Sequence, residues 1–175
     1  LMRLEPQAAA AGGGVHVVLG NHDVMNLVGD LRYVARGEFA AFAGDETRAQ
    51  RDAAYARFVA AAPRPLTRAE FDERFPPGFF AHRAAFSASG RYGRWLLGKP
   101  VALRIGDTLF VHAGVSAALP VSDLAGLAAM RDALVEFAEL LEQAVARGLL
   151  DATTDFYDMP KLLSRAVESG SEAAA

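Results

Sequence analysis

The sequence predicts an α/β fold in which a few short strands are separated by a mostly helical segment. Residues 15–19 form a β-branched apolar run of strand length, and three glycines stand just before it. Two further apolar runs, 101–105 and 108–112, flank Gly106-Asp107, a dipeptide typical of a hairpin turn. We therefore expect a sheet built from these strands, with a helical insertion over residues 35–98 between them.

The expected helices follow from their caps, their spacing and their stops. Thr67 and Glu70 match a capping box, and Gly148 closes a long amphipathic helix. Gly12 is a natural stop for a helix that is already under way at Leu1. One expected helix begins with a cap at Asp45 or Thr47 and runs to about Ala62, where Pro63 and Pro65 end it. The other expected helices cover residues 1–11, 24–28, part of 35–44, 67–75, 123–147 and 160–168.

The composition argues against several classes of protein. A net charge of −3 gives no support to a nucleic-acid-binding surface. No apolar stretch approaches the roughly 18 residues that a membrane span needs. The chain has no cysteine, which excludes disulfides and thiolate metal sites and is compatible with the cytoplasm.

The two ends of the chain lead to expectations about its extent. Leu1 is not a methionine, and the first helix has no visible start, so we expect the chain to be part of a longer protein. We also expect one partial domain over residues 1–168 and a disordered tail over residues 169–175, which are mainly Ser, Gly and Ala.

Polar side chains follow two of the expected strands. Asn21, His22 and Asp23 come directly after the run 15–19, and His112 ends the run 108–112. Amide oxygen and imidazole are ligands that suit a divalent ion such as Mn, Fe or Zn, and a second imidazole can protonate a leaving group. These parts suit a two-metal hydrolase, whereas an Asn-His pair in a loop can also be purely structural.

These residues lie within a longer pattern that resembles a known family. Gly20-Asn21-His22-Asp23 is similar to the GNH(D/E) motif of calcineurin-like metallophosphoesterases, and residues 110–115 are similar to their HGG-type motif. Residues 21–34, 80–86 and 90–96 resemble the Shewanella-like protein phosphatase branch of the phosphoprotein-phosphatase group. The resemblance runs from about residue 1 to residue 120.

The resemblance implies a fold, a cofactor and roles for four residues. The fold would be a partial metallophosphoesterase β-sandwich flanked by helices, and the intact site would hold two divalent metal ions (Mn, Fe or Zn). Asn21 and His112 would be metal ligands, and His22 would be the general acid. Asp23, which stands where the branch more usually has Glu, would brace the loop or orient His22.

Four further residues are candidates for binding substrate. His82 and Arg83 either cover a substrate phosphate or form a structural hydrogen-bond cluster. Arg91 and Arg94 offer paired donors that suit phosphate, although a surface or ion-pairing role fits them equally. We expect the insertion 35–98 to form a cap over the metal site.

The function expected from the resemblance is hydrolysis of phosphomonoesters by a metal-bound hydroxide. Its substrate would be a phosphorylated protein or a small phosphomonoester, with no nucleic-acid or membrane partner. Alternatives are a nucleotide or dinucleoside polyphosphate hydrolase of the same superfamily, and a non-catalytic binding module. The family's GDxHG and GDxxDRG motifs would precede Leu1, and no His follows His112, so the chain by itself is expected to be inactive.

Overall fold

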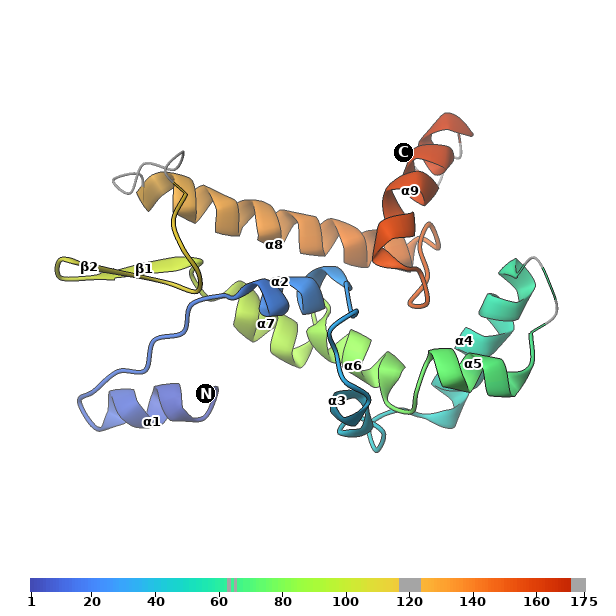
Figure 1. Ribbon diagram of the computed structural model, residues 1–175, viewed down its shortest axis with the longest axis horizontal. Helices are drawn as coiled ribbons and strands as arrows, with labels where there is room; N and C mark the ends of the chain where they lie inside the picture. The colour runs from blue at the N-terminus through green and yellow to red at the C-terminus, as the bar shows by residue number, and fades with distance from the viewer. Residues whose placement is uncertain (63, 65, 117–123, 171–175) are drawn as a thin grey trace.

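The computed structural model describes residues 1–62, 64, 66–116 and 124–170, and helices dominate this part of the chain (Figure 1). The described elements are α1 (Leu4–Ala10), α2 (Asn21–Val28), α3 (Arg36–Ala40), α4 (Arg48–Ala61), α5 (Arg68–Arg74), α6 (Phe79–Phe86), α7 (Arg91–Leu97), β1 (Ala102–Ile105), β2 (Thr108–Val111), α8 (Leu124–Ala146), the 3₁₀ turn η1 (Phe156–Asp158) and α9 (Met159–Glu168). The expected α/β fold is therefore wrong for the described residues, which contain no β-sandwich.

The strand expected over residues 15–19 is the main reason for this difference. The segment is extended, but the only ladder-like bond of its described backbone runs from the Leu19 N–H to the Pro100 carbonyl at 2.9 Å. An extended segment becomes a sheet strand only when a neighbour pairs with successive backbone groups. Apolar composition predicted the extended conformation here, but it did not supply the partner.

The expected hairpin is confirmed, with each strand slightly shorter than expected. β1 and β2 pair antiparallel in a two-stranded sheet, from Ala102 opposite Val111 to Ile105 opposite Thr108. Gly106 has a φ of 59° at the first central position of the turn, a conformation that glycine adopts without steric cost.

The caps read from the sequence are also confirmed. The Thr47 hydroxyl accepts a hydrogen bond from the Gln50 N–H at 3.1 Å and begins α4. At α5, Thr67 and Glu70 form the expected reciprocal capping box. Pro63, Pro65, residue 123 and residues 171–175 of the expected tail lie outside the described residues.

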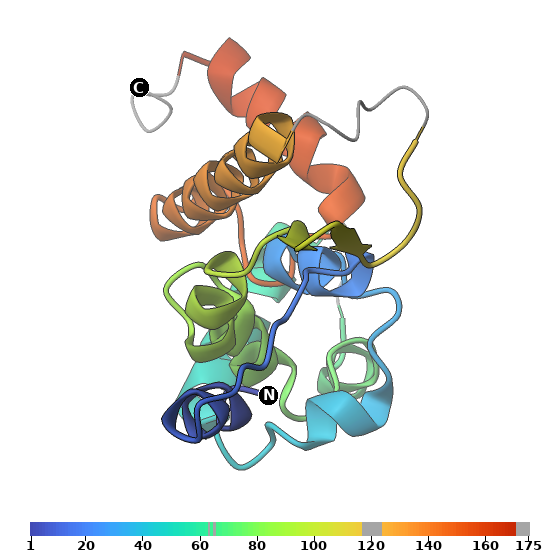
Figure 2. The same ribbon diagram turned by 90° about the vertical axis from the view of Figure 1, so that its left-hand side faces the viewer.

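Helix α2 lies in the middle of the described core (Figures 1 and 2). One apolar cluster joins it to α7 and α8 through Leu19, Leu27, Leu96, Leu97 and Ala138. A second cluster joins Val28 of α2 to α8 and to the start of α9 at Met159. This packing fixes both ends of α2, and with them the residues that precede and follow it.

A third cluster is aromatic and holds the helical insertion together. Phe71 and Phe75 of α5 pack against Phe80 of α6 and Ala54 of α4. Within the expected helical insertion 35–98, two helices had been given no bounds of their own, and these are α6 and α7.

The long helix α8 buries only part of its apolar residues. Leu127 and Leu141 are buried, whereas Met130 and Phe137 are 56% and 45% exposed. Within the described residues, no helix is both long enough and apolar enough to cross a membrane.

Candidate functional site

The Gly20–Asp23 motif forms the first turn of α2, not the loop that the sequence predicted. Gly20 is the extended N-cap residue, and the Asp23 carboxylate accepts a hydrogen bond from the Gly20 N–H at 2.8 Å. A carboxylate at the third helical position satisfies one backbone donor and also favours the positive end of the helix dipole. Asp23 therefore braces the motif, and its bonded oxygen is turned toward the backbone.

Asn21 and His112 lie side by side although 91 residues separate them. His112 directly follows β2, and its Nε2 is 3.0 Å from the Asn21 Oδ1. The hairpin carries His112 back to the start of α2. Both side chains are exposed.

Gly20 makes this approach possible. A Cβ built at Gly20 would stand 2.9 Å from Nδ1 of His112, closer than real Cβ atoms come to other atoms. The His112 ring therefore packs directly on the Gly20 backbone. Any larger residue at position 20 would push the ring away from Asn21.

The Asn21–His112 pair fits part of the shell of a single divalent cation. Two donors at right angles on one ion, with bonds of about 2.1 Å, would be about 3.0 Å apart. This matches the observed separation between Oδ1 and Nε2. Within the described residues, however, no group of three or more His, Cys, Asp or Glu side chains is placed to hold a metal ion. Asn21 and His112 are therefore spaced as two ligands of one divalent ion would be, and the expected two-metal centre stays a prediction.

His22 lies beside this pair on the first turn of α2. Its ring stacks on the ring of Tyr33, with centroids 5.3 Å apart and an angle of 5° between the planes. Its backbone carbonyl accepts a hydrogen bond from Asn26, and no described residue bonds to its ring nitrogens. The imidazole is thus oriented by stacking and remains open to a ligand.

Tyr33 belongs to a small cluster that was not among the predicted site residues. Arg32 holds both oxygens of the buried Asp30 at 2.8 Å, and its guanidinium lies over the rings of Tyr33 and Tyr157. The hydrogen bond from Arg32 lowers the pKa of Asp30 despite its burial. The sequence pointed to Arg32 and Tyr33 only through the resemblance of residues 21–34, which gave these two residues no role.

Among the four candidates for binding substrate, none has a hydrogen bond, ion pair or ring contact with Asn21, His22 or His112 in the described part of the chain. Arg94 donates to the Ser89 carbonyl, and Arg91 lies over the Tyr92 ring. His82 is buried among aromatic rings, and Arg83 packs against Gly29 at the far end of α2.

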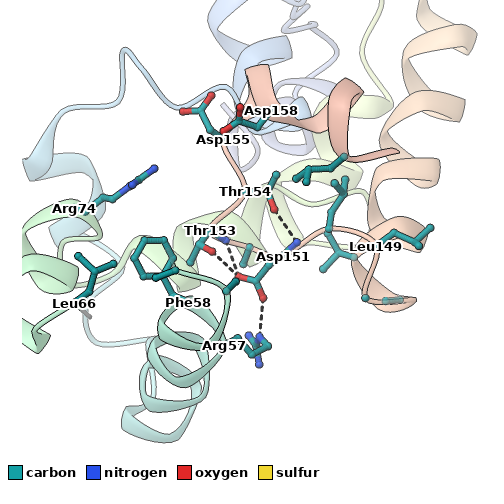
Figure 3. A pocket seen from close by; sticks show the side chains of 18 of the residues that line it. Arg57, Phe58, Leu66, Arg74, Leu149, Asp151, Thr153, Thr154, Asp155 and Asp158 are labelled. Carbon is teal, nitrogen blue, oxygen red and sulfur yellow. Dashed lines mark hydrogen bonds and ion pairs between the residues drawn. The ribbon is translucent and has the colours of Figure 1, made fainter. Parts of the chain in front are cut away.

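A separate groove of about 960 Å³ lies between α4, α5 and the segment that follows α8 (Figure 3). Asp151 is fixed in its wall by Arg57 at 2.6 Å and by the hydroxyl and N–H of Thr153. Burial alone would raise the pKa of Asp151, but these hydrogen bonds outweigh it and lower the pKa. The groove does not include Asn21, His22 or His112.

Comparisons of the chain with protein-family models, with curated proteins and with solved structures found no match. Inferences about the function of this chain therefore rest on the chemistry and geometry of its own residues. Among the predicted site residues in the described part of the chain, Asn21 and His112 are the pair whose side chains meet although they lie far apart in the sequence.

Proposed function

We propose that this chain supplies part of the active site of a metal-dependent phosphomonoester hydrolase of the calcineurin-like metallophosphoesterase type. The observation that carries the proposal is the 3.0 Å approach of Asn21 Oδ1 and His112 Nε2, from two motifs that the resemblance had assigned to one metal ion. A phosphorylated protein or a small phosphomonoester is the proposed substrate.

Each residue has a distinct part in this proposal. Asn21 and His112 offer an amide oxygen and an imidazole nitrogen to one divalent cation. Because Oδ1 only accepts hydrogen bonds, Nε2 carries the proton in the observed contact, and that proton must move to Nδ1 before Nε2 can act as a ligand. A cation held there would polarise a phosphoryl oxygen.

His22 is the proposed proton donor to the leaving oxygen. Its ring is exposed, and stacking on Tyr33 restricts its orientation. A general acid needs a defined orientation and hydrogen-bond reach to the atom that it protonates. Asp23 supports this role by holding the first turn of α2 in place.

Metal binding tests the proposal directly. In a titration of the chain with Mn²⁺ followed by electron paramagnetic resonance, we expect weak binding, because two protein ligands hold a divalent ion poorly. Asn21→Ala and His112→Ala should each weaken binding at least about tenfold, as loss of a ligand removes about half of the protein's donors. His22→Ala and His16→Ala should leave it unchanged. Equal Mn²⁺ affinity in all five proteins would contradict the proposal.

A non-catalytic binding module is the second candidate, because no group of three or more His, Cys, Asp or Glu side chains in the described part of the chain is placed to hold a metal ion. The reading frame before the codon for Leu1 separates the two. A GDxHG and a GDxxDRG motif there would support the hydrolase, and a start codon without them would support the binding module. The chain by itself is expected not to hydrolyse p-nitrophenyl phosphate with Mn²⁺.

A further inference from the structure

Three arginines from different parts of the chain line one cavity at the C-terminal end of α2. This cavity, about 220 Å³ in volume, lies between the 29–32 segment, the end of α5, the start of α6 and the 152–156 loop. Arg32, Arg74 and Arg83 contribute to its wall, and we call it the arginine cavity. Its other charged lining residues are Asp30 and Asp155, so three guanidinium groups face two carboxylates.

Arg83 is the unusual member of this set. Its guanidinium is packed against Gly29, and a Cβ at that position would overlap it. No carboxylate or carbonyl of the described residues accepts a hydrogen bond from Arg83, although the side chain is half-buried. Burial lowers the pKa of Arg83, but a guanidinium stays protonated in proteins. The cavity wall therefore contains a half-buried positive charge that has no counter-ion among the described residues.

The position of Arg83 explains how this charge is tolerated in the free protein. Gly29 is the left-handed C-cap of α2, with a φ of 84°. The C-terminal end of a helix carries partial negative charge, which favours a nearby cation. That interaction is worth much less than a paired carboxylate or phosphate, so Arg83 retains most of its capacity to bind an anion.

Two other groups add donors to the same cavity. Arg74 lies near the Phe58 and Phe75 rings, and it has no ion pair with a described residue. Figure 3 shows it extending toward the loop that carries Thr154 and Asp155. The Thr154 hydroxyl accepts the Asp151 N–H at 2.9 Å, and its own hydrogen has no acceptor among the described residues.

Three of the four carboxylate oxygens of the cavity already accept hydrogen bonds from described residues. Both oxygens of Asp30 are held by Arg32. One oxygen of Asp155 accepts the Tyr157 N–H at 2.9 Å and caps η1. Neither carboxylate forms an ion pair with Arg74 or Arg83 in the described residues.

We propose that the arginine cavity binds a tetrahedral oxyanion of the phosphate type. A phosphate group has enough oxygens to accept hydrogen bonds from several guanidinium forks at once, whereas a carboxylate has only two. Arg83 and Arg74 supply charges that have no ion pair among the described residues, Arg32 supplies the donors that Asp30 leaves free, and Thr154 supplies a hydroxyl. The site is at the opposite end of α2 from Asn21, and it does not depend on the metal-binding proposal.

Calorimetric titration with inorganic phosphate tests this site. The chain is kept at pH 7.5 with EDTA and constant ionic strength, so that metal binding at Asn21 and His112 plays no part. We expect saturable binding that Arg83→Gln and Arg74→Gln each weaken at least about tenfold, the effect of losing one charge-assisted contact. Arg48→Gln is the matched control, because Arg48 is an exposed arginine of α4 outside the cavity, and it should bind phosphate like the wild type.

Thermal unfolding provides a second measurement, whose expected result differs from the result for an Arg83 with a purely structural role. Removing a half-buried charge that has no ion pair in the described part of the chain should leave the midpoint of the Arg83→Gln variant unchanged or higher in phosphate-free buffer. Phosphate should raise the midpoint of the wild type and not that of the variant. If Arg83→Gln does not fold, Arg83→Lys and Arg74→Gln carry the same comparison.

Three results would overturn the proposal. One is the absence of saturable binding with millimolar phosphate. Another is equal phosphate affinity in the wild type and both cavity variants. The third is acetate binding as tightly as phosphate, which would assign the cavity to carboxylates instead.

Discussion

His82 shows at the scale of one residue how the fold changes the chemistry of a side chain. It is only 3% exposed, and its Nδ1 has no hydrogen-bond partner. The rings of Phe39, Phe42 and Phe86 surround it with centroids 4.6 to 5.0 Å from its own. Burial is the main cause that lowers its pKa to about 4, and the nearby charge of Arg83 adds to this, while Glu38 acts weakly in the opposite direction.

The low pKa of His82 predicts a loss of stability in acid. The unfolded chain takes up a proton on this residue below pH 6.5, but the folded chain does so only near pH 4. Stability contributed by neutral His82 is therefore complete above pH 6.5 and falls by about 3 kcal/mol on going down to pH 4. Urea unfolding of the wild type and of His82→Leu at several pH values measures this contribution.

Carboxylates titrate in both proteins, so the difference between the two curves of unfolding free energy against pH gives the contribution of His82. The His82→Leu variant should lose less stability between pH 6.5 and pH 4. Parallel profiles would show that the imidazole does not remain neutral in the folded state.

At the scale of elements, Arg51 links three helices through one side chain. From α4 it reaches Glu46 at 2.5 Å and Asp72 of α5 at 2.8 Å, and it donates to the Phe75 and Pro76 carbonyls. Glu46 also accepts the Phe80 N–H at the start of α6. Arg51 and Glu46 are 12% and 5% exposed, so this ion pair is shielded from water.

Removal of Arg51 is therefore expected to be costly. Arg51→Met leaves the Glu46 carboxylate buried without its partner, which typically costs roughly 3–5 kcal/mol of unfolding free energy. Arg48→Met on the same helix is the control, because Arg48 is 94% exposed and 3.5 Å from Asp52; its cost should stay under about 0.5 kcal/mol. Urea unfolding checks both, and equal costs would contradict a buried network.

At the scale of the whole molecule, α1 is attached differently from the other helices. None of its residues is buried, and extended chain connects it to α2 (Figures 1 and 2). Its contact with α7 depends on the Glu5 carboxylate, which accepts a hydrogen bond from Trp95 at 2.8 Å and pairs with Lys99 at 2.5 Å. Polar contacts, and not a shared apolar core, hold α1 in place.

Glu5→Ala should accordingly release α1 without unfolding the rest. We expect faster amide exchange over residues 4–10 and a red shift of Trp95 emission, while the midpoint of thermal unfolding changes by less than about 2 °C. Gln7→Ala, on the same helix and exposed, should change neither signal. A large fall in the midpoint would mean that α1 belongs to the cooperative core.

Local signals in the sequence predicted the local features of this structure. Caps at Thr47 and Thr67 and the turn at Gly106 hold as expected, because each depends on residues a few positions apart. The expected α/β sheet failed, because pairing of the 15–19 segment depends on a neighbour that its own composition cannot specify. Arg51 and Arg83 look alike in the sequence, although one is fully paired and the other is not.

The sequence by itself determined which residue types stand at the motif around Asn21 and at His112, and so which chemistry they offer. Only the tertiary structure decided that Asn21 and His112 meet over Gly20, that Asp23 is used as a helix brace, and that His82 is neutral and buried. The physical reason is that ligand sets, buried charges and shifted pKa values depend on contacts between residues far apart in the chain, and packing of α2 against α7 and α8 sets those contacts.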